Sequence, residues 1–150
     1  MKLTLEQILG FWLFALATVL ATHPAMAADD NPVFIVKQTT RSVNDVVTAV
    51  KAFAKQKKWV YLGDFKVKKG QVVLVKFCVR AAGKKAWKAG LKVSAFLPCG
   101  NMGVYKKDGK TEISLLNPDY MTRLYPNPNL KEAVAILAPM YKEMMQAITK

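Results

Sequence analysis

Hydrophobic positions along the chain change their spacing several times, and each change predicts a different element. Val33–Val36 is a short, mostly β-branched apolar run closed by the polar residues Lys37–Arg41, which predicts a buried strand. Apolar residues then recur at helical spacing from Val43 to Ala54. Ser42 precedes this stretch with Asp45 three residues later, an acidic form of the capping box, so we expect a helix to begin after Ser42.

The middle of the chain predicts a hairpin followed by a short helix. Trp59–Val67 and Val72–Val79 are strand-like runs separated by Lys68–Gln71, whose glycine can supply the positive φ of a tight turn. Arg80–Ala89 loses the β-branched residues and gains Ala and Lys. This composition predicts a short basic helix that ends at Gly90.

A second hairpin is predicted further along. Two apolar runs, Val93–Leu97 and Met102–Tyr105, flank a break that contains proline, cysteine and glycine. The Asp-Gly pair at 108–109 then stands between two alternating segments, which is the strongest hairpin signal in the sequence. We therefore expect an antiparallel pair of strands on either side of this turn.

The C-terminal third predicts helices. Asn117 and Pro118 match the cap and first position of a short helix. We expect the last helix to open at Asn129, with Glu132 three residues on and an apolar stripe at helical spacing: Leu130, Val134, Leu137, Tyr141, Met144 and Ile148. Pro139 interrupts this pattern and should kink the helix. The methionines of this helix suit either core packing or a dimer surface or ligand groove.

This order of elements predicts one α+β domain, in which helices cover one face of an antiparallel sheet. We expect this single domain to span residues 28–150, because no internal repeat or low-complexity linker divides it.

Residues 1–27 carry the pattern of a signal peptide. Lys2 begins a short basic region, Ile8–Ala21 is almost wholly apolar, and Ala25-Met26-Ala27 offers the small residues that signal peptidase accepts. The apolar run is shorter than the roughly 20 residues of a membrane span, which favours cleavage near Ala27 over an uncleaved membrane anchor. The mature product is then expected in a periplasm or outside the cell.

The composition of the chain limits the kinds of catalytic and metal-binding site that the mature protein can contain. The chain has 150 residues, 52% of them hydrophobic, with 23 Lys and Arg against 10 Asp and Glu and a formal net charge of +13. Its single histidine, His23, lies in the predicted signal, which argues against a histidine metal site or triad in the mature protein. The carboxylates form no helical acid–base pair, and no glycine loop has the helix and lysine of a phosphate-binding loop. We therefore expect a protein that is not an enzyme.

Several motifs together resemble the bacterial domain of unknown function 302 family. These motifs are Ser42-Val43-Asn44-Asp45-Val46-Val47, Cys78, Phe96-Leu97-Pro98-Cys99, Asn117-Pro118-Asp119 and Asn127-Pro128-Asn129-Leu130. The resemblance covers nearly all of the chain after the predicted signal. It implies a β-α-β(4)-α domain similar to the TATA-binding-protein-like fold class, a homodimer, and no established reaction. This sequence differs from the usual pattern in its short link Lys68–Gln71 and in Gly100, where the family more often has asparagine.

The two cysteines, Cys78 and Cys99, allow several interpretations. They can form a disulfide in an exported protein, or pack as two small buried thiols. Cys99 and Met102 have C-x-x-M spacing, and with Cys78 as a third soft donor they can bind copper(I). Alternatively, Cys78 can act in thiol redox chemistry, because the helix expected at Arg80–Ala89 and its cations would lower the thiol pKa.

Lysines gather in four groups at predicted helix faces and hairpin tips: Lys55-Lys57-Lys58, Lys66-Lys68-Lys69, Lys84-Lys85-Lys88-Lys92 and Lys106-Lys107-Lys110. A fold that brings two of these groups together would create a positive patch for an acidic protein or an anionic membrane surface. Nucleic acid is not an expected partner, because the protein is exported and base recognition relies on arginine, of which the chain has few. The sequence thus predicts an exported, non-enzymatic binding or accessory module.

Overall fold

The computed structural model describes residues 33–95 and 100–150, so the predicted signal at 1–27 lies outside the described residues. The first half contains β1 (Phe34–Thr39), α2 (Val43–Gln56), β2 (Val60–Val67), the 3-10 turn η1 (Lys68–Gly70) and β3 (Val72–Cys78). The second half contains α3 (Arg80–Ala86), the 3-10 helices η2 (Trp87–Ala89) and η3 (Leu91–Ala95), β4 (Gly100–Lys107), β5 (Lys110–Leu116), α4 (Asp119–Leu124) and α5 (Pro128–Ile148).

The five strands form one antiparallel sheet in the order β1-β5-β4-β3-β2. The predicted α+β class is therefore confirmed, and the order along the chain is β-α-β(4)-α with short helices added. The Asp-Gly hairpin is also confirmed. Asp108 has a φ of 49° and Gly109 a φ of 77°, which is the paired positive φ that a two-residue type I′ turn needs.

The two long helices cover one face of the sheet and enclose the core. Phe77 of β3 stacks on Trp59 with ring centroids 5.5 Å apart, Phe53 of α2 meets Trp59 edge-on, and Tyr141 of α5 meets Phe77 edge-on. Met144 and Met145 of α5 are both buried in this core. The methionines of the last helix thus serve mainly in core packing.

The end of the chain is tied to the end of β1. Thr39 Oγ1 donates a hydrogen bond to the carbonyl oxygen of Thr149 at 3.1 Å, and Arg41 Nη1 donates to the carbonyl oxygen of Ile148 at 3.3 Å. These bonds hold the last turn of α5 against the junction between β1 and α2.

The start of α2 follows the sequence prediction, whereas the start of α5 does not. Ser42 caps α2, and Ser42 and Asp45 exchange the two hydrogen bonds of a capping box. The last helix begins two residues earlier than expected, since Asn127 is its N-cap and Pro128 its first residue. The helix then continues through Pro139 as one 21-residue element.

Two further predictions were wrong in detail. The basic helix expected over Arg80–Ala89 ends at Ala86 and continues as the separate 3-10 helix η2, because the chain tightens at Trp87 before Gly90 turns it at a φ of 109°. Val33–Val36 was expected to form a buried strand, but residues 34–36 lie in the edge strand β1, where Phe34 is 56% and Val36 47% exposed, because the long helices cover only one face of the sheet. Of the apolar run that begins at Val93, the described part lies in the 3-10 helix η3, with Val93 buried. Within residues 33–95 and 100–150, no helix is long and apolar enough to cross a membrane.

Candidate binding surfaces

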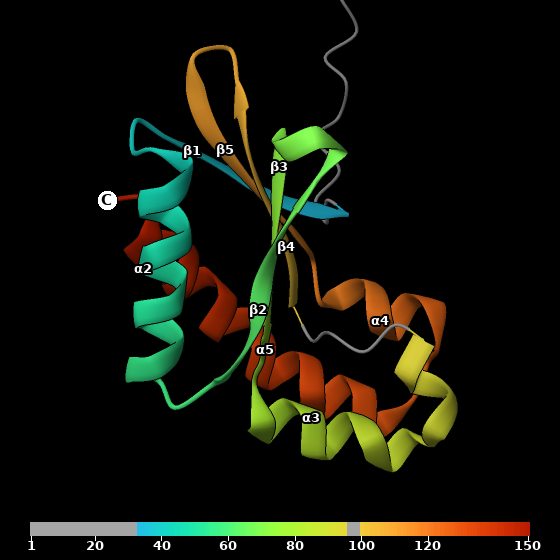
Figure 1. Cartoon of the computed structure of the whole chain (residues 1–150). Helices are drawn as coiled ribbons and strands as arrows, with labels where there is room; N and C mark the ends of the chain where they lie inside the picture. Colours follow the sequence, from blue (N-terminus) through green and yellow to red (C-terminus); the bar gives the residue numbers. More distant parts are fainter. Residues whose placement is uncertain (1–32, 96–99) are drawn as a thin grey trace, which may run out of the picture.

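Two of the four lysine groups lie at the same end of the sheet. In an antiparallel sheet the β2–β3 and β4–β5 turns must point the same way, and Figure 1 shows both turns beside the start of α2. The exposed lysines Lys66, Lys68 and Lys69 come from the first turn, and Lys106, Lys107 and Lys110 from the second. We call these six residues the basic end. The fold therefore brings two of the four lysine groups together in one positive patch.

The first of these turns has an unusual backbone. Lys68 and Lys69 both adopt left-handed conformations, with φ values of 50° and 55°, and Gly70 follows at 84°. A left-handed backbone costs an L-residue such as lysine roughly 1–2 kcal/mol, and only the glycine of this turn avoids that cost. The turn thus presents two lysines in exposed positions that favour glycine.

A pocket of about 410 Å³ opens at the basic end, between the start of α2 and the two turns. It is lined by Lys66, Lys106, Asn44, Gln71, Val43, Val73 and Gly70, and none of these residues carries a carboxylate. The nearby Asp45 is occupied by Ser42, whose Oγ lies 2.7 Å from Asp45 Oδ2. Hydrogen bonds from the Ser42 side chain and backbone lower the pKa of Asp45. The lining suits an anionic group, because it includes two lysines and two residues with side-chain amides.

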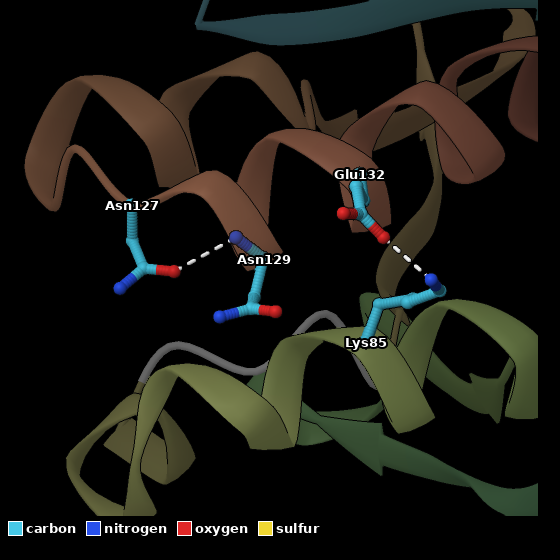
Figure 2. Close-up of polar contacts among 4 residues, drawn as sticks. All are labelled: Lys85, Asn127, Asn129 and Glu132. Carbon is cyan, nitrogen blue, oxygen red and sulfur yellow. Dashed lines mark hydrogen bonds and ion pairs between the residues drawn. The ribbon is translucent and has the colours of Figure 1, made fainter.

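The other two lysine groups lie at the opposite end of the molecule and are partly neutralised. Lys57 Nζ lies 2.6 Å from Glu143 Oε1, and Lys85 Nζ lies 2.5 Å from Glu132 Oε2. Figure 2 shows the second pair joining α3 to α5, further along α5 than its N-cap Asn127, whose side chain accepts a hydrogen bond from the backbone N–H of Asn129. At the basic end, by contrast, Lys107 alone has a carboxylate of the described residues within 4.0 Å, at 3.6 Å from Glu112 Oε2.

A polar cluster lies on the sheet face that the long helices leave uncovered. Tyr105 Oη donates to Glu112 Oε1 at 2.7 Å, and Gln38 Nε2 donates to Glu112 Oε2 at 3.0 Å. The hydrogen bond from Gln38, followed by that from Tyr105, lowers the pKa of Glu112, and the same carboxylate raises the pKa of Tyr105. A Cβ at Gly103 would lie 2.9 Å from Ser114 Oγ, so the glycine leaves room for this cluster.

Sequence reasoning missed this cluster, although the Asp-Gly turn contained the necessary information. A two-residue turn at 108–109 fixes the pairing of residues equally distant from it, and Tyr105 indeed pairs with Glu112. Around the cluster, the same face carries large apolar side chains that are about a third to a half exposed: Phe34, Val36, Phe65, Val67 and Leu116. An exposed apolar area of this kind is typical of a protein interaction site.

The structure does not bring all the predicted metal donors together. Met102 is fully buried, and its pairing with Val75 and Leu115 places it on the core face of the sheet. Cys78 follows the core residue Phe77, so strand alternation places it on the opposite face, with Sγ 3.8 Å from the Cβ position of Gly83. Cys99 lies outside the described residues.

The disulfide, copper and redox interpretations of Cys78 and Cys99 therefore stay predictions. The described residues contain no group of three or more His, Cys, Asp and Glu that could hold a metal ion. Cys78 does precede a helix that carries Arg80, Lys84 and Lys85, as the redox interpretation expected. That helix has seven residues and is shorter than the expected Arg80–Ala89.

Comparison with known proteins supports the resemblance found in the sequence. The family model described as "Domain of unknown function DUF302" matches residues 35–149, which include every strand except the first residue of β1 and all of the helices. The chain belongs to the DUF302 family. No curated protein matches the chain. A DUF302 protein from Bacillus stearothermophilus, described as an uncharacterized conserved protein, has a similar crystal structure, with a TM-score of 0.64 and 20% sequence identity. The similarity covers 78% of this chain and 95% of that one, and it shows a shared DUF302 fold.

Proposed function

We propose that this protein is an exported, non-enzymatic binding module that holds an anionic partner at its basic end. The observation that carries the proposal is the meeting of two lysine groups, some 40 residues apart in sequence, on either side of a pocket without a carboxylate. Long-range attraction by such a patch speeds the encounter with an acidic partner, and the pocket gives one anionic group a defined place. The signal pattern at residues 1–27 supports a periplasmic or secreted location.

The surface of the pocket favours a carboxylate or phosphate carried by a larger acidic partner. The pocket of about 410 Å³ is open to the exposed lysines of both turns, so a chain of anionic groups can continue from it across the basic end. An acidic protein segment meets this requirement. Because the ammonium groups are solvent-exposed, we expect the affinity for the acidic partner to fall as the salt concentration rises. At physiological ionic strength the screening length is already about 8 Å.

A decaglutamate peptide provides a direct test. Isothermal titration at low salt should show binding that weakens about tenfold in a Lys66→Gln, Lys106→Gln variant, a loss of about 1.4 kcal/mol. A Lys84→Gln, Lys88→Gln variant is the matched control, since it removes the same charge at the other end of the molecule. Equal losses in the two variants would show a general charge effect and would overturn the proposal.

We also propose that the homodimer implied by the family resemblance forms through the uncovered sheet face. Strand pairing places only two charged residues of the strand interiors on this face, Lys76 and Glu112, whereas lysines crowd the ends of the sheet. Two copies with a formal charge of +13 each repel least when they meet through their least charged apolar face.

A further inference from the structure

Three large apolar side chains are exposed around one corner of the molecule. Leu91 of η3 is 82% exposed, Leu124 of α4 is 66% exposed, and Trp87 of η2 is 46% exposed. Lys92 Nζ lies 4.5 Å from the centroid of the Tyr125 ring, so η3 rests against the connection between α4 and α5. Leu91 precedes Lys92 and Leu124 precedes Tyr125 in the chain, so this contact brings together the two segments that carry the leucines. In Figure 1 the chain after α3 and the end of α4 both lie at the right of the molecule.

Cations are frequent in the segments that carry these apolar side chains. Residues 80–95 contain five cations and no acidic residue: Arg80, Lys84, Lys85, Lys88 and Lys92. Arg123 and Lys131 add two more from α4 and α5. Two acidic residues lie in the same parts of the chain, Asp119 at the start of α4 and Glu132 in the first half of α5. Glu132 is paired with Lys85. The corner thus combines protruding apolar groups with a net positive charge.

We propose that this corner docks on the surface of an anionic lipid bilayer. Leu91 and Leu124 insert among the acyl chains at the level of the headgroups, and the surrounding cations meet the lipid phosphates. Leu91 and Leu124 protrude from the surface, and neither is among the residues that line the nearby pocket at Thr122, Pro126, Asn127, Pro128 and Lys131. Protruding side chains suit a fluid surface that closes around them, whereas a protein partner would need matching cavities. The corner lies at the opposite end from the two hairpin turns, so this inference does not rest on the function proposed for the basic end.

Vesicle flotation tests the inference with the protein isolated after removal of residues 1–27, which its intact mass establishes. Vesicles of phosphatidylethanolamine and phosphatidylglycerol should carry the protein to the top of the gradient, and vesicles of phosphatidylcholine alone should not. A Leu91→Ser, Leu124→Ser variant should bind the anionic vesicles at least about tenfold more weakly. The reason is that moving each leucine side chain from water into the bilayer contributes appreciably to the binding free energy. Removal of residues 1–27 takes the apolar run Ile8–Ala21, with Trp12, out of the measurement, so this run can neither bind vesicles nor shift the tryptophan emission.

Two controls identify the surface. Leu62→Ser removes a leucine of β2 that is 48% exposed and should leave flotation unchanged. Lys68→Gln, Lys69→Gln should weaken decaglutamate binding while vesicle binding persists. As an independent readout, tryptophan emission should shift to shorter wavelength on anionic vesicles, and this shift should disappear in Trp87→Phe.

The inference would be overturned by equal binding to phosphatidylcholine, by unchanged flotation of the double leucine variant, or by absence of flotation. An acidic protein captured through this corner, without vesicle binding, would overturn it as well.

Discussion

Tyr105 and Glu112 face each other across the β4–β5 hairpin, and the phenol donates a 2.7 Å hydrogen bond to the carboxylate. The carboxylate lies on the uncovered sheet face yet is almost fully buried, because Tyr105 and Gln38 lie over it. This arrangement makes the stability of the domain sensitive to pH.

We predict that Tyr105→Phe destabilises the protein more at pH 7 than at pH 3. The folded state lowers the pKa of Glu112, so the stabilisation from its ionised form is present above the ordinary glutamate value and is lost as pH falls through the lowered pKa. Urea unfolding at the two pH values measures the difference. A Glu112→Gln variant is the control, because its stability should lack this acid-dependent step. An equal effect of Tyr105→Phe at both pH values would contradict the prediction.

Gly103→Ala should destabilise the domain by about 1 kcal/mol, since the new methyl group would meet Ser114 Oγ at 2.9 Å and force it to move. The double variant Gly103→Ala, Ser114→Ala should recover part of this loss, because the second change removes the oxygen. Thermal unfolding of the two single variants and the double variant measures the coupling. Additive effects would show that the close approach is unimportant.

Lys69→Gly should stabilise the protein by about 0.5–1 kcal/mol, because glycine adopts the φ of 55° without the steric penalty of a side chain. This gain is partly offset, since glycine loses more backbone entropy on folding than lysine does. The same change should weaken decaglutamate binding, since it removes one cation of the basic end. Chemical denaturation and titration of one variant measure both effects. A destabilised variant would mean that the lysine side chain supports the turn.

A disulfide between Cys78 and Cys99 is the prediction for protein isolated from an oxidising compartment. In the sequence, Cys78 directly follows Phe77 and Cys99 directly precedes Gly100. Phe77 and Gly100 form the last described pair of the β3–β4 ladder. Intact mass before and after reduction, with alkylation, measures the state of both thiols. Reduction should then cost about 3 kcal/mol of stability.

Two thiols that alkylate without reduction would contradict the disulfide. The copper interpretation then becomes testable, because anaerobic copper(I) binding should fall in Cys99→Ser. The burial of Met102 in the core predicts that Met102→Leu leaves any such binding unchanged.

Phe65→Asp should turn the proposed dimer into a monomer, because it places a charge on a side chain of the uncovered sheet face that is 50% exposed. Leu124→Asp is the matched control on α4 and should leave the dimer intact. Size-exclusion chromatography with light scattering measures the mass of each. A monomeric parent protein, or a dimeric Phe65→Asp variant, would exclude this interface.

Local sequence rules predicted most of the fold. The capping box at Ser42, the Asp-Gly turn and the alternating strands depend on neighbouring residues, so the sequence shows them directly. The start of α5 was misplaced because Asn127 and Asn129 both suit a cap, and only the folded chain shows which one caps it. The 3-10 turn around Val93 follows from burial against distant elements, which no local pattern records.

The candidate sites were predicted less completely, because they depend on which distant segments meet. The four lysine groups were visible, but the sheet order decides that two of them share one end. The set of Cys78 and Met102 was drawn from residue type and spacing, and the pairing of β3 and β4 places the two on opposite faces. The exposure of Leu91 and Leu124 had no signature in the sequence, since isolated leucines also occupy cores.

The hydrogen bonds from Thr39 and Arg41 to the last turn of α5 also bear on how the chain folds during its synthesis. Among the described strands β1 pairs with β5 alone, more than 70 residues later, and the end of β1 is fixed by the carbonyl of residue 149. The sheet therefore cannot be completed on the ribosome until β5 has emerged, and the end of β1 is not fixed until the last turn of α5 has emerged. During that interval the apolar residues of β1 have no ladder partner among the described strands and can pair with another chain.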